Sequence, residues 1–340
     1  MARRIRKSLW PRSFQRTLGA LTRATVRAGT RAVVKAAKKA AKPARERREP
    51  LAGPGDWAGG MTLGPTGAHR YQLYKPPGAR KSARMPLLVM LHGCGQDAKG
   101  FARSTRLHRL AAREGFFVLF PEQDRLANAQ GCWNWFDTRS GRAFGEAAAI
   151  VTAIDQVSAL YAVDPARVAV AGLSAGASMA ALLATRYPAR FKAVAMHSGI
   201  APGAAHSSAT VLGAMTGRRR PGPLPAAAAG AAGLPPLLVI QGTADSIVRL
   251  SNGRAAAQVW ADAAGAQSAA PRSVQRGKRY PMTVTDFKLK ARTAASLCEV
   301  SGLGHAWSGG AAGQHFSDAK GPDASRMIWA FAARQFRKAG

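Results

Sequence analysis

Short apolar runs alternate with amphipathic stretches along the chain after residue 50. A continuous apolar run of about five residues is typical of a strand buried on both faces of a sheet, whereas apolar residues three or four positions apart indicate a helix. These patterns predict an edge strand at 71–74 and further strands at 87–91, 116–120, 168–171, 193–197, 237–240 and 284–289. They predict helices at 98–114, 144–161, 176–187 and 323–338. Such alternation builds βαβ units, so we expect an α/β fold with a mostly parallel central sheet flanked by helices.

Two segments depart from this alternation. A stretch rich in Pro and Gly at 50–55 marks a boundary in the chain. It predicts a tail at 1–50 followed by one folded domain at 51–340. Residues 200–235 are rich in Ala, Gly and Pro and include a run of arginines. We expect this second stretch to form a lid or loop insertion at the carboxyl edge of the sheet, where ligands of open α/β sheets usually bind.

Basic residues are concentrated in the tail without being confined to it. The chain has 50 Lys and Arg against 17 Asp and Glu, a net charge of +33, and residues 1–50 hold 16 of the basic and 2 of the acidic residues. Apolar residues in the first half of the tail fit one stripe of an amphipathic helix, but a disordered, solvated extension fits the composition equally well. Because a positive field attracts anions, the expected partner of residues 1–50 is an anionic surface such as a granule, lipid or nucleic acid.

The sequence lacks the features of metalloenzymes and membrane proteins. It has three cysteines and neither a CxxC nor an HExxH motif, so we expect no metal site and no cofactor. No run approaches 18 consecutive apolar residues, so we expect no transmembrane segment. The uncharged stretches of the tail are broken by polar residues, and no apolar core of a signal peptide is evident.

A G-x-S-x-G motif lies between a predicted buried strand and a predicted helix, in the segment VAVAGLSAG at 168–176. In this context Ser174 would occupy a sharp strand-to-helix turn, and the flanking glycines would let the neighbouring elements approach closely. A serine hydroxyl needs an imidazole to remove its proton, and that imidazole needs a carboxylate to fix its tautomer. Ser174 is therefore the candidate nucleophile.

Candidates for these two partners follow in the chain order Ser, Asp, His that such sheets use. Asp245 comes five residues after the predicted strand that ends at Ile240, and His305 lies in GLGHAW after the last strand-like run. Asp286 is disfavoured because it lies inside a predicted strand. We therefore expect Asp245 and His305 to complete a catalytic triad with Ser174.

An oxyanion hole is expected beside the nucleophile. The segment HGCGQ at 92–96 follows the first predicted buried strand, and its small residues would allow backbone N–H groups to approach a developing oxyanion. We assign this role to the N–H groups of Cys94 and Ala175.

Four motifs together resemble the polyhydroxybutyrate-depolymerase-type esterases of the α/β-hydrolase superfamily. They are HGCGQ (92–96), GCWNWF (131–136), GLSAG (172–176) and GLGHAW (302–307). The resemblance implies the α/β-hydrolase fold and a Ser174–His305–Asp245 triad that hydrolyses short-chain 3-hydroxyacyl esters, such as polyhydroxybutyrate or its oligomers, through an acyl-enzyme. Feruloyl and acetylxylan esterases share these motifs, so a carboxylesterase of that type is the first alternative. Outside the enzymes, the alternative is a granule- or nucleic-acid-binding protein that acts through its basic tail.

The motif residues also include candidates for structural and substrate contacts. The resemblance suggests that Cys94 and Cys132 pair in a disulfide, and two free buried thiols are the alternative. His92, Trp133, Trp135 and Trp307 are expected to bind substrate, the three indoles by lining an apolar acyl site. Core packing would account equally well for Trp133 and Trp135.

Different features of the sequence favour different cellular locations. The basic tail and the lack of an evident signal peptide favour a cytoplasmic or granule-associated protein, whereas the resemblance leaves an extracellular or periplasmic location open. A disulfide would favour the second, because disulfides persist in oxidising compartments.

Overall fold

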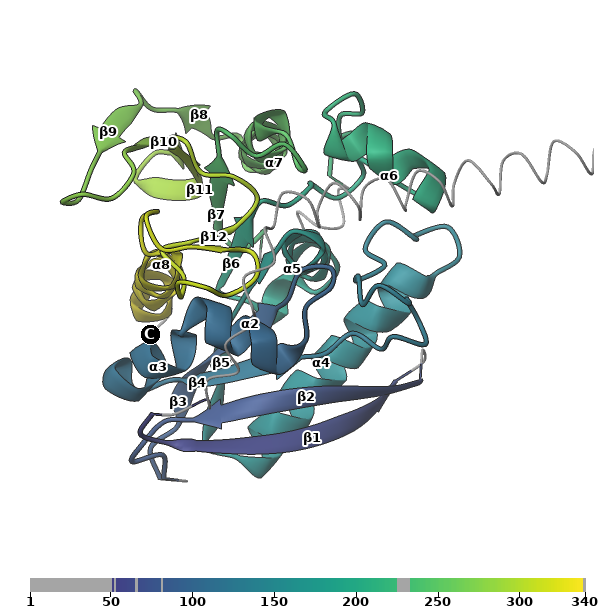
Figure 1. Cartoon of the computed structure of the whole chain (residues 1–340), viewed down its shortest axis with the longest axis vertical. Coiled ribbons are helices and arrows are strands. Elements are labelled where there is room, and N and C mark those ends of the chain that lie inside the picture. The colour runs from purple at the N-terminus through teal and green to yellow at the C-terminus, as the bar shows by residue number, and fades with distance from the viewer. Residues whose placement is uncertain (1–50, 52, 65–66, 81, 225–232, 339–340) are drawn as a thin grey trace, which may run out of the picture. The chain divides into compact units, whose positions relative to one another are not determined.

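The computed structural model describes residues 51, 53–64, 67–80, 82–224 and 233–338 (Figure 1). The predicted tail at 1–50 lies outside the described residues, as does the part of the expected lid at 225–232. Within the described ranges, the predicted α/β fold with a mostly parallel central sheet is confirmed.

The central sheet has eleven strands in the order β1-β2-β4-β3-β5-β6-β7-β11-β10-β8, with β9 paired to β10. Its strands are β1 (Asp56–Gly64), β2 (Gly67–Lys75), β3 (Met85–Leu91), β4 (Phe117–Pro121), β5 (Val163–Leu173), β6 (Ala193–His197), β7 (Leu237–Gly242), β8 (Gln267–Ser268), β9 (Arg272–Val274), β10 (Met282–Leu289) and β11 (Arg292–Val300). The neighbours from β4 to β11 pair in parallel, and antiparallel strands lie at both edges. Two short strands, β12 (Trp307–Ser308) and β13 (Ser317–Asp318), form a separate pair.

Helices cover both faces of the sheet. They are α2 (Ala98–Thr105), α3 (Leu107–Glu114), α4 (Arg142–Leu160), α5 (Ala175–Arg186), α6 (Ser208–Met215), α7 (Leu250–Ala263), α8 (Ala324–Lys338) and a 3-10 helix (Pro188–Arg190). Leu87 and Val89 of β3 belong to the core that includes residues of α4, α5 and α7, whereas Leu88 and Met90 belong to the core that includes residues of α2, α3 and α8. Because both faces are covered, the central strands are continuous apolar runs in the sequence.

The predicted helix at 98–114 is wrong as a single helix. The helix is interrupted at Arg106, which has a positive φ of 51° and separates α2 from α3. Its backbone N–H donates to the carbonyl of Ala102, and its guanidinium donates to the carbonyls of Gly309 and Gly310. The break is therefore stabilised by contacts with a distant part of the chain.

Helix α4 is the one described helix that is long and apolar enough to cross a membrane. Its buried residues pack into one of the two cores beside the sheet, and one of them is the carboxylic acid Glu146. This packing is that of a core helix in an α/β domain.

The parallel strands bring their carboxyl ends to one edge of the sheet, where ligands of such folds bind. The segments that leave β3, β5, β7 and β11 at this edge contain HGCGQ, Ser174, Asp245 and His305. Residues 200–224 follow β6 at the same edge and contain α6, at the position expected for the lid insertion.

Candidate functional site

Ser174 occupies the turn between β5 and α5. It has φ 56° and ψ −119°, outside the regions that non-glycine residues favour, and its N–H donates to the carbonyl of His197 at 2.9 Å. Strained backbone of this kind is typical of functional sites, because surrounding contacts must hold it.

Two glycines let this turn pack closely against its neighbours. A side chain at Gly176 would overlap the carbonyl groups of Leu91 and His92, and one at Gly172 would overlap the backbone of Gly176. Gly93 lies against Ser174, since a Cβ added at Gly93 would be 3.5 Å from the Ser174 Cβ atom. The G-x-S-x-G turn therefore packs directly against the segment that contains HGCGQ.

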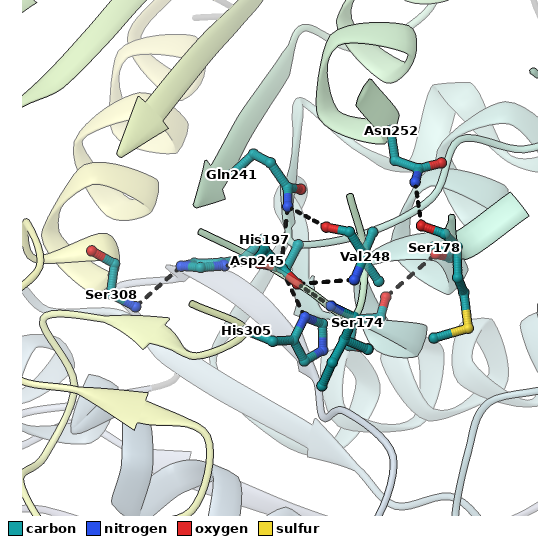
Figure 2. A network of polar contacts seen from close by, with 12 residues as sticks. Ser174, Ser178, His197, Gln241, Asp245, Val248, Asn252, His305 and Ser308 are labelled. Atoms are coloured by element: carbon teal, nitrogen blue, oxygen red, sulfur yellow. Dashed lines mark hydrogen bonds and ion pairs between the residues drawn. The ribbon is translucent and has the colours of Figure 1, made fainter. Parts of the chain in front are cut away.

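His305 and Asp245 form a hydrogen-bonded pair. The His305 Nδ1 atom lies 2.8 Å from the Asp245 Oδ2 atom, and the Asp245 side chain has no solvent exposure. The carboxylate accepts a hydrogen bond from the Nδ1–H group, and this tautomer leaves the Nε2 lone pair free to accept a proton. Figure 2 shows Ser174 in the same group of polar residues as this pair. Among the described contacts, no hydrogen bond joins the Ser174 hydroxyl to His305.

Both oxygen atoms of the Asp245 carboxylate accept hydrogen bonds. Its Oδ1 atom accepts from the backbone N–H groups of Ile247 and Val248 at 3.0 and 2.9 Å, and its Oδ2 atom also accepts from Gln241 Nε2 at 3.1 Å (Figure 2). Burial by itself would raise the pKa of Asp245. The hydrogen bond and charge of His305, with the N–H donors of Val248 and Ile247, instead hold that pKa below its usual value. Asp245 is therefore ionised wherever the imidazole functions as a base.

His197 lies beneath this pair at the end of β6. Its ring is completely buried and stacks on Trp307, with ring centroids 5.1 Å apart, and its Nε2 atom accepts from the N–H of Ser308 at 3.1 Å. Burial and the neighbouring His305 lower the pKa of His197 to about 3, against the opposing effect of Asp245. His197 is thus a neutral residue that fastens the segment after His305 to the sheet.

The two N–H groups assigned to the oxyanion hole flank Ser174. The Ala175 N–H opens α5 and, like the other N–H groups of a first helical turn, has no acceptor within the helix. Around Cys94, the N–H groups of Gly93, Gly95 and Gln96 donate to Gln96 Oε1, the Gln130 carbonyl and the Gly93 carbonyl. The Cys94 N–H has no acceptor among the described residues. Neither N–H group therefore has a hydrogen-bond acceptor among the described residues.

Cys94 and Cys132 are joined by a disulfide, with Cα atoms 4.3 Å apart. The bond links the HGCGQ segment after β3 to the GCWNWF segment that precedes α4. The third cysteine, Cys298 in β11, is buried and free, and burial raises its pKa to about 12.

The expected substrate contacts of His92, Trp133 and Trp307 need correction, because these residues are fully buried. His92, Trp133 and Trp307 have no exposed surface, and Trp135 is only 6% exposed. Both ring nitrogens of His92 are engaged, with the Gly93 carbonyl and the Gln123 N–H, and Trp307 donates to the Ser325 hydroxyl. The three fully buried residues support the site from within the core, whereas a substrate contact of Trp135 stays a prediction.

Three residues of this region were not expected from the sequence, namely His197, Gln241 and Glu146. Each is a fully buried polar residue. His197 and Glu146 have hydrogen-bond partners 111 and 23 residues away in the chain, whereas Gln241 contacts Asp245 and Val248 just after its own strand. The signal available in the sequence was a polar residue inside an otherwise apolar run, as in LLVIQG or VAMH. Among the described residues, no group of three His, Cys, Asp or Glu side chains is placed to hold a metal ion.

Similar sequences are found among poly(3-hydroxyalkanoate) depolymerases, feruloyl esterases and acetylxylan esterases. Poly(3-hydroxyalkanoate) depolymerase C of Paucimonas lemoignei is 37% identical over 129 residues, which is 38% of this chain and 31% of that protein. Feruloyl esterase B of Neurospora crassa is 34% identical over 139 residues, 40% of this chain and 46% of that protein. The chain thus matches less than half the length of either relative.

Similar folds are found among solved esterase structures. The acetyl xylan esterase from Aspergillus awamori superposes with a TM-score of 0.62 at 19% identity, over 73% of this chain and 94% of that one. An S-formylglutathione hydrolase from Agrobacterium tumefaciens superposes with a TM-score of 0.52 at 18% identity, over 85% and 97%. The expected α/β-hydrolase fold is confirmed by this likeness.

The family assignment rests on a longer match than either relative provides. The model of the family described as Esterase PHB depolymerase matches residues 69–275, more than half of the chain. This range contains the HGCGQ, GCWNWF and GLSAG motifs and Asp245. The chain therefore belongs to the Esterase PHB depolymerase family.

Proposed function

We propose that this chain is a serine carboxylesterase in which Ser174 is the nucleophile, His305 the general base and Asp245 the carboxylate that orients His305. The single observation that carries the proposal is the buried His305–Asp245 pair at the edge of the sheet where Ser174 occupies its strained turn. Nucleophile, base and orienting group in this arrangement form the constellation of serine hydrolases.

The reaction proceeds in two halves. His305 Nε2 takes the Ser174 proton as the serine oxygen attacks the ester carbonyl, and the tetrahedral intermediate expels the alcohol, which receives the proton from His305. Water then attacks the acyl-enzyme with His305 again as base, and the carboxylic acid leaves as Ser174 regains its proton. Because His305 must be uncharged to accept a proton, activity falls at acidic pH.

The N–H groups of Cys94 and Ala175 hold the oxyanion in both halves. Their lack of acceptors within the described chain supports this role, and the Ala175 N–H also lies at the positive end of the α5 dipole. Removal of one such donor in other serine hydrolases costs about 3–4 kcal/mol of transition-state stabilisation.

The proposed substrates are short-chain 3-hydroxyacyl esters, such as polyhydroxybutyrate or its oligomers. The family assignment and the 37% identity to a poly(3-hydroxyalkanoate) depolymerase support this choice. A feruloyl- or acetylxylan-type esterase is the second candidate, because feruloyl esterase B matches over a similar share of the chain. Turnover of 3-hydroxybutyrate esters, methyl ferulate and acetylated xylan, compared by kcat/KM, separates the two.

A fluorophosphonate probe tests the nucleophile directly. The probe forms a covalent bond with an activated serine, and peptide mass spectrometry identifies the labelled residue. The proposal expects the label on Ser174, and expects that prior incubation with substrate slows labelling. A label on any other serine would contradict the assignment.

The proposal also covers the compartment in which the enzyme acts and the surface that residues 1–50 bind. The Cys94–Cys132 disulfide supports an oxidising compartment, which favours the extracellular or periplasmic alternative over the cytoplasm. Residues 1–50, with their excess of positive charge, would then hold the enzyme on an anionic surface. Co-sedimentation of the full chain and of a chain lacking residues 1–50 with anionic particles, at low and high salt, tests this role.

A further inference from the structure

The segment that carries Cys94 is held from three directions. His92 Nδ1 lies 2.9 Å from the Gly93 carbonyl, the Gly95 N–H donates to the Gln130 carbonyl at 2.9 Å, and the Cys94 side chain is bonded to Cys132. The Gly95 contact and the disulfide lead directly to the region between β4 and α4, and the other ring nitrogen of His92 contacts the same region through Gln123. This region contains no regular secondary structure from 122 to 141. The region between β4 and α4 can therefore position Cys94 only if other contacts hold the region itself in place.

Glu146 of α4 holds this region at its centre. Its side chain is completely buried, and its Oε1 atom accepts from Gln123 Nε2 at 2.7 Å and from Asn134 Nδ2 at 2.5 Å. The Oε2 atom accepts from the Asn134 backbone N–H at 2.8 Å. One carboxylate thus joins Gln123, near the start of the region, and Asn134, inside it, to a helix that packs on the sheet.

Two chains of contacts lead from Glu146 to Cys94. The first passes through Gln123, whose backbone N–H donates to His92 Nε2 at 3.1 Å, and then through His92 to Gly93. In addition, Gln123 Nε2 donates to the carbonyl of Cys132, the disulfide partner of Cys94, at 3.1 Å. Because His92 Nε2 accepts a hydrogen bond, Nδ1 carries the proton and donates to the Gly93 carbonyl.

The second chain of contacts passes through Asn134. Its Oδ1 atom accepts from Asn128 Nδ2 at 2.9 Å, and Asn128 Oδ1 accepts from the Gln130 N–H at 3.0 Å. The carbonyl of Gln130 in turn accepts from the Gly95 N–H. Glu146 is therefore connected to the residues on both sides of Cys94.

We propose that Glu146 is a positioning residue that holds the Cys94 N–H where the oxyanion develops. The role rests on the proposed function, because it presumes that Cys94 supplies an oxyanion donor. The three donors to Glu146 are neutral amides, and among the described residues no ion pair includes it. Burial raises the pKa of the Glu146 carboxyl, whereas its hydrogen bonds with Asn134 and Gln123 and the charge of Arg142 act to lower that pKa. An apolar side chain would fill the same space without the cost of burying a carboxyl group. The specific benefit of the carboxylate is that it accepts from several donors at once.

Glu146→Gln tests the proposal in the full chain. The substitution keeps the size of the side chain but places an NH₂ group against one of the three donors. Asp286→Asn is the matched control, because it removes a half-buried carboxylate that accepts from Arg272 and Ser296 in β10, at the far edge of the sheet. For each variant we would measure kcat and KM on a soluble ester, the inhibition constant of a trifluoromethyl ketone and the melting temperature. The ketone is a suitable probe because its adduct with serine carries the oxyanion.

We expect Glu146→Gln to lower kcat about 10- to 100-fold, since a small displacement of an oxyanion donor forfeits part of its stabilisation. KM should change less than about twofold, and the ketone should bind more weakly by the same factor as kcat/KM falls. Asp286→Asn should leave kcat and ketone binding unchanged. Unchanged kcat in Glu146→Gln, or an equal loss of kcat in Asp286→Asn at an equal loss of stability, would overturn the proposal.

A second variant covers the case in which Glu146→Gln does not fold. Gln123→Met leaves the two Asn134 contacts of Glu146 in place but removes the amide that contacts Glu146 and the Cys132 carbonyl. It should show a smaller loss with the same signature, and unchanged kcat would again overturn the proposal. Failure of the proposed function gives a different result, because the wild-type chain itself would then hydrolyse no ester.

Discussion

The Nδ1 atom of His305 lies 2.8 Å from the Oδ2 atom of Asp245, although 60 residues separate them in the chain. The sheet brings them together, because β7 and β11 are parallel neighbours and both residues follow the carboxyl ends of these strands. The pair is nearly inaccessible to solvent, with side-chain exposures of 6% for His305 and 0% for Asp245. A shielded imidazole–carboxylate pair of this kind serves to fix one tautomer of the ring.

Asp245→Asn should abolish most of the activity while the fold persists. An amide in place of the carboxylate can donate to the imidazole, which then holds the wrong tautomer, and the comparable change in other serine hydrolases lowers kcat about ten-thousandfold. Steady-state kinetics on a soluble ester measures the loss, and circular dichroism confirms that the variant is folded. Activity within tenfold of wild type would show that Asp245 does not orient the base.

Gln241→Leu should lower kcat by a smaller factor. The leucine removes the Nε2 donor to Asp245 Oδ2 and to the Val248 carbonyl, and loss of one hydrogen bond to a charged group costs about 1.5–3 kcal/mol. We therefore expect kcat to fall about tenfold or more, with KM nearly unchanged. Gln258→Leu in α7 is a matched control, because its amide contacts only the exposed Asp262 side chain. An equal loss of kcat in both variants would contradict a specific role for Gln241.

His197 should make the protein less stable as the pH falls. Burial lowers its pKa from 6.5 to about 3 in the folded chain, so below pH 6.5 the unfolded chain binds a proton that the folded chain does not. The resulting loss of stability begins near pH 6.5, continues until the pH reaches the folded-state pKa and amounts to about 5 kcal/mol in total. Denaturant unfolding of wild type and His197→Asn across this range measures it. The stability difference between the two proteins should shrink as the pH falls, whereas a difference independent of pH would contradict the assignment.

The Cys94–Cys132 disulfide should add measurable stability. Its half-cystines are 38 residues apart in the chain, and closure of a loop of that length stabilises a folded protein by about 4 kcal/mol in the chain-entropy treatment. Cys132→Ser should therefore lower the free energy of unfolding by an amount of this order. Alkylation of the denatured chain followed by mass measurement should label one cysteine without reductant and three with it. Three labels without reductant would show that the thiols are free.

The sequence pattern predicted β3 to β7 because both faces of the sheet are covered, which makes each of these strands a continuous apolar run. It did not predict β1, whose sequence DWAGGMTLG lacks such a run, β11, whose apolar run in RTAASLCEV is interrupted by polar residues, or α7, in which many small residues weaken the helical periodicity. Because β1 pairs with β2, the strand expected at the edge at 71–74 lies inside the sheet. The break at Arg106 depends on carbonyl groups about two hundred residues further along the chain, which no local pattern can reveal.

Within the candidate site, local patterns and tertiary contacts contributed differently. Ser174 was singled out as the candidate nucleophile because a strained turn requires glycines at fixed positions, and those glycines are visible in the sequence. The position of Trp307 beside His305 in the chain did not reveal that its ring turns into the core and stacks on His197. The role of Glu146 depends on Gln123 and Asn134, which meet it only in the folded chain.

The most direct test of the proposed chemistry is the release of 3-hydroxybutyrate from amorphous polyhydroxybutyrate particles by wild type, Ser174→Ala and Ser158→Ala. Ser158 is a suitable control because its hydroxyl donates only to the Ile154 carbonyl within α4. Release by wild type and Ser158→Ala, and none by Ser174→Ala, is the predicted result. Equal release by Ser174→Ala and wild type would contradict the assignment of Ser174 as the nucleophile.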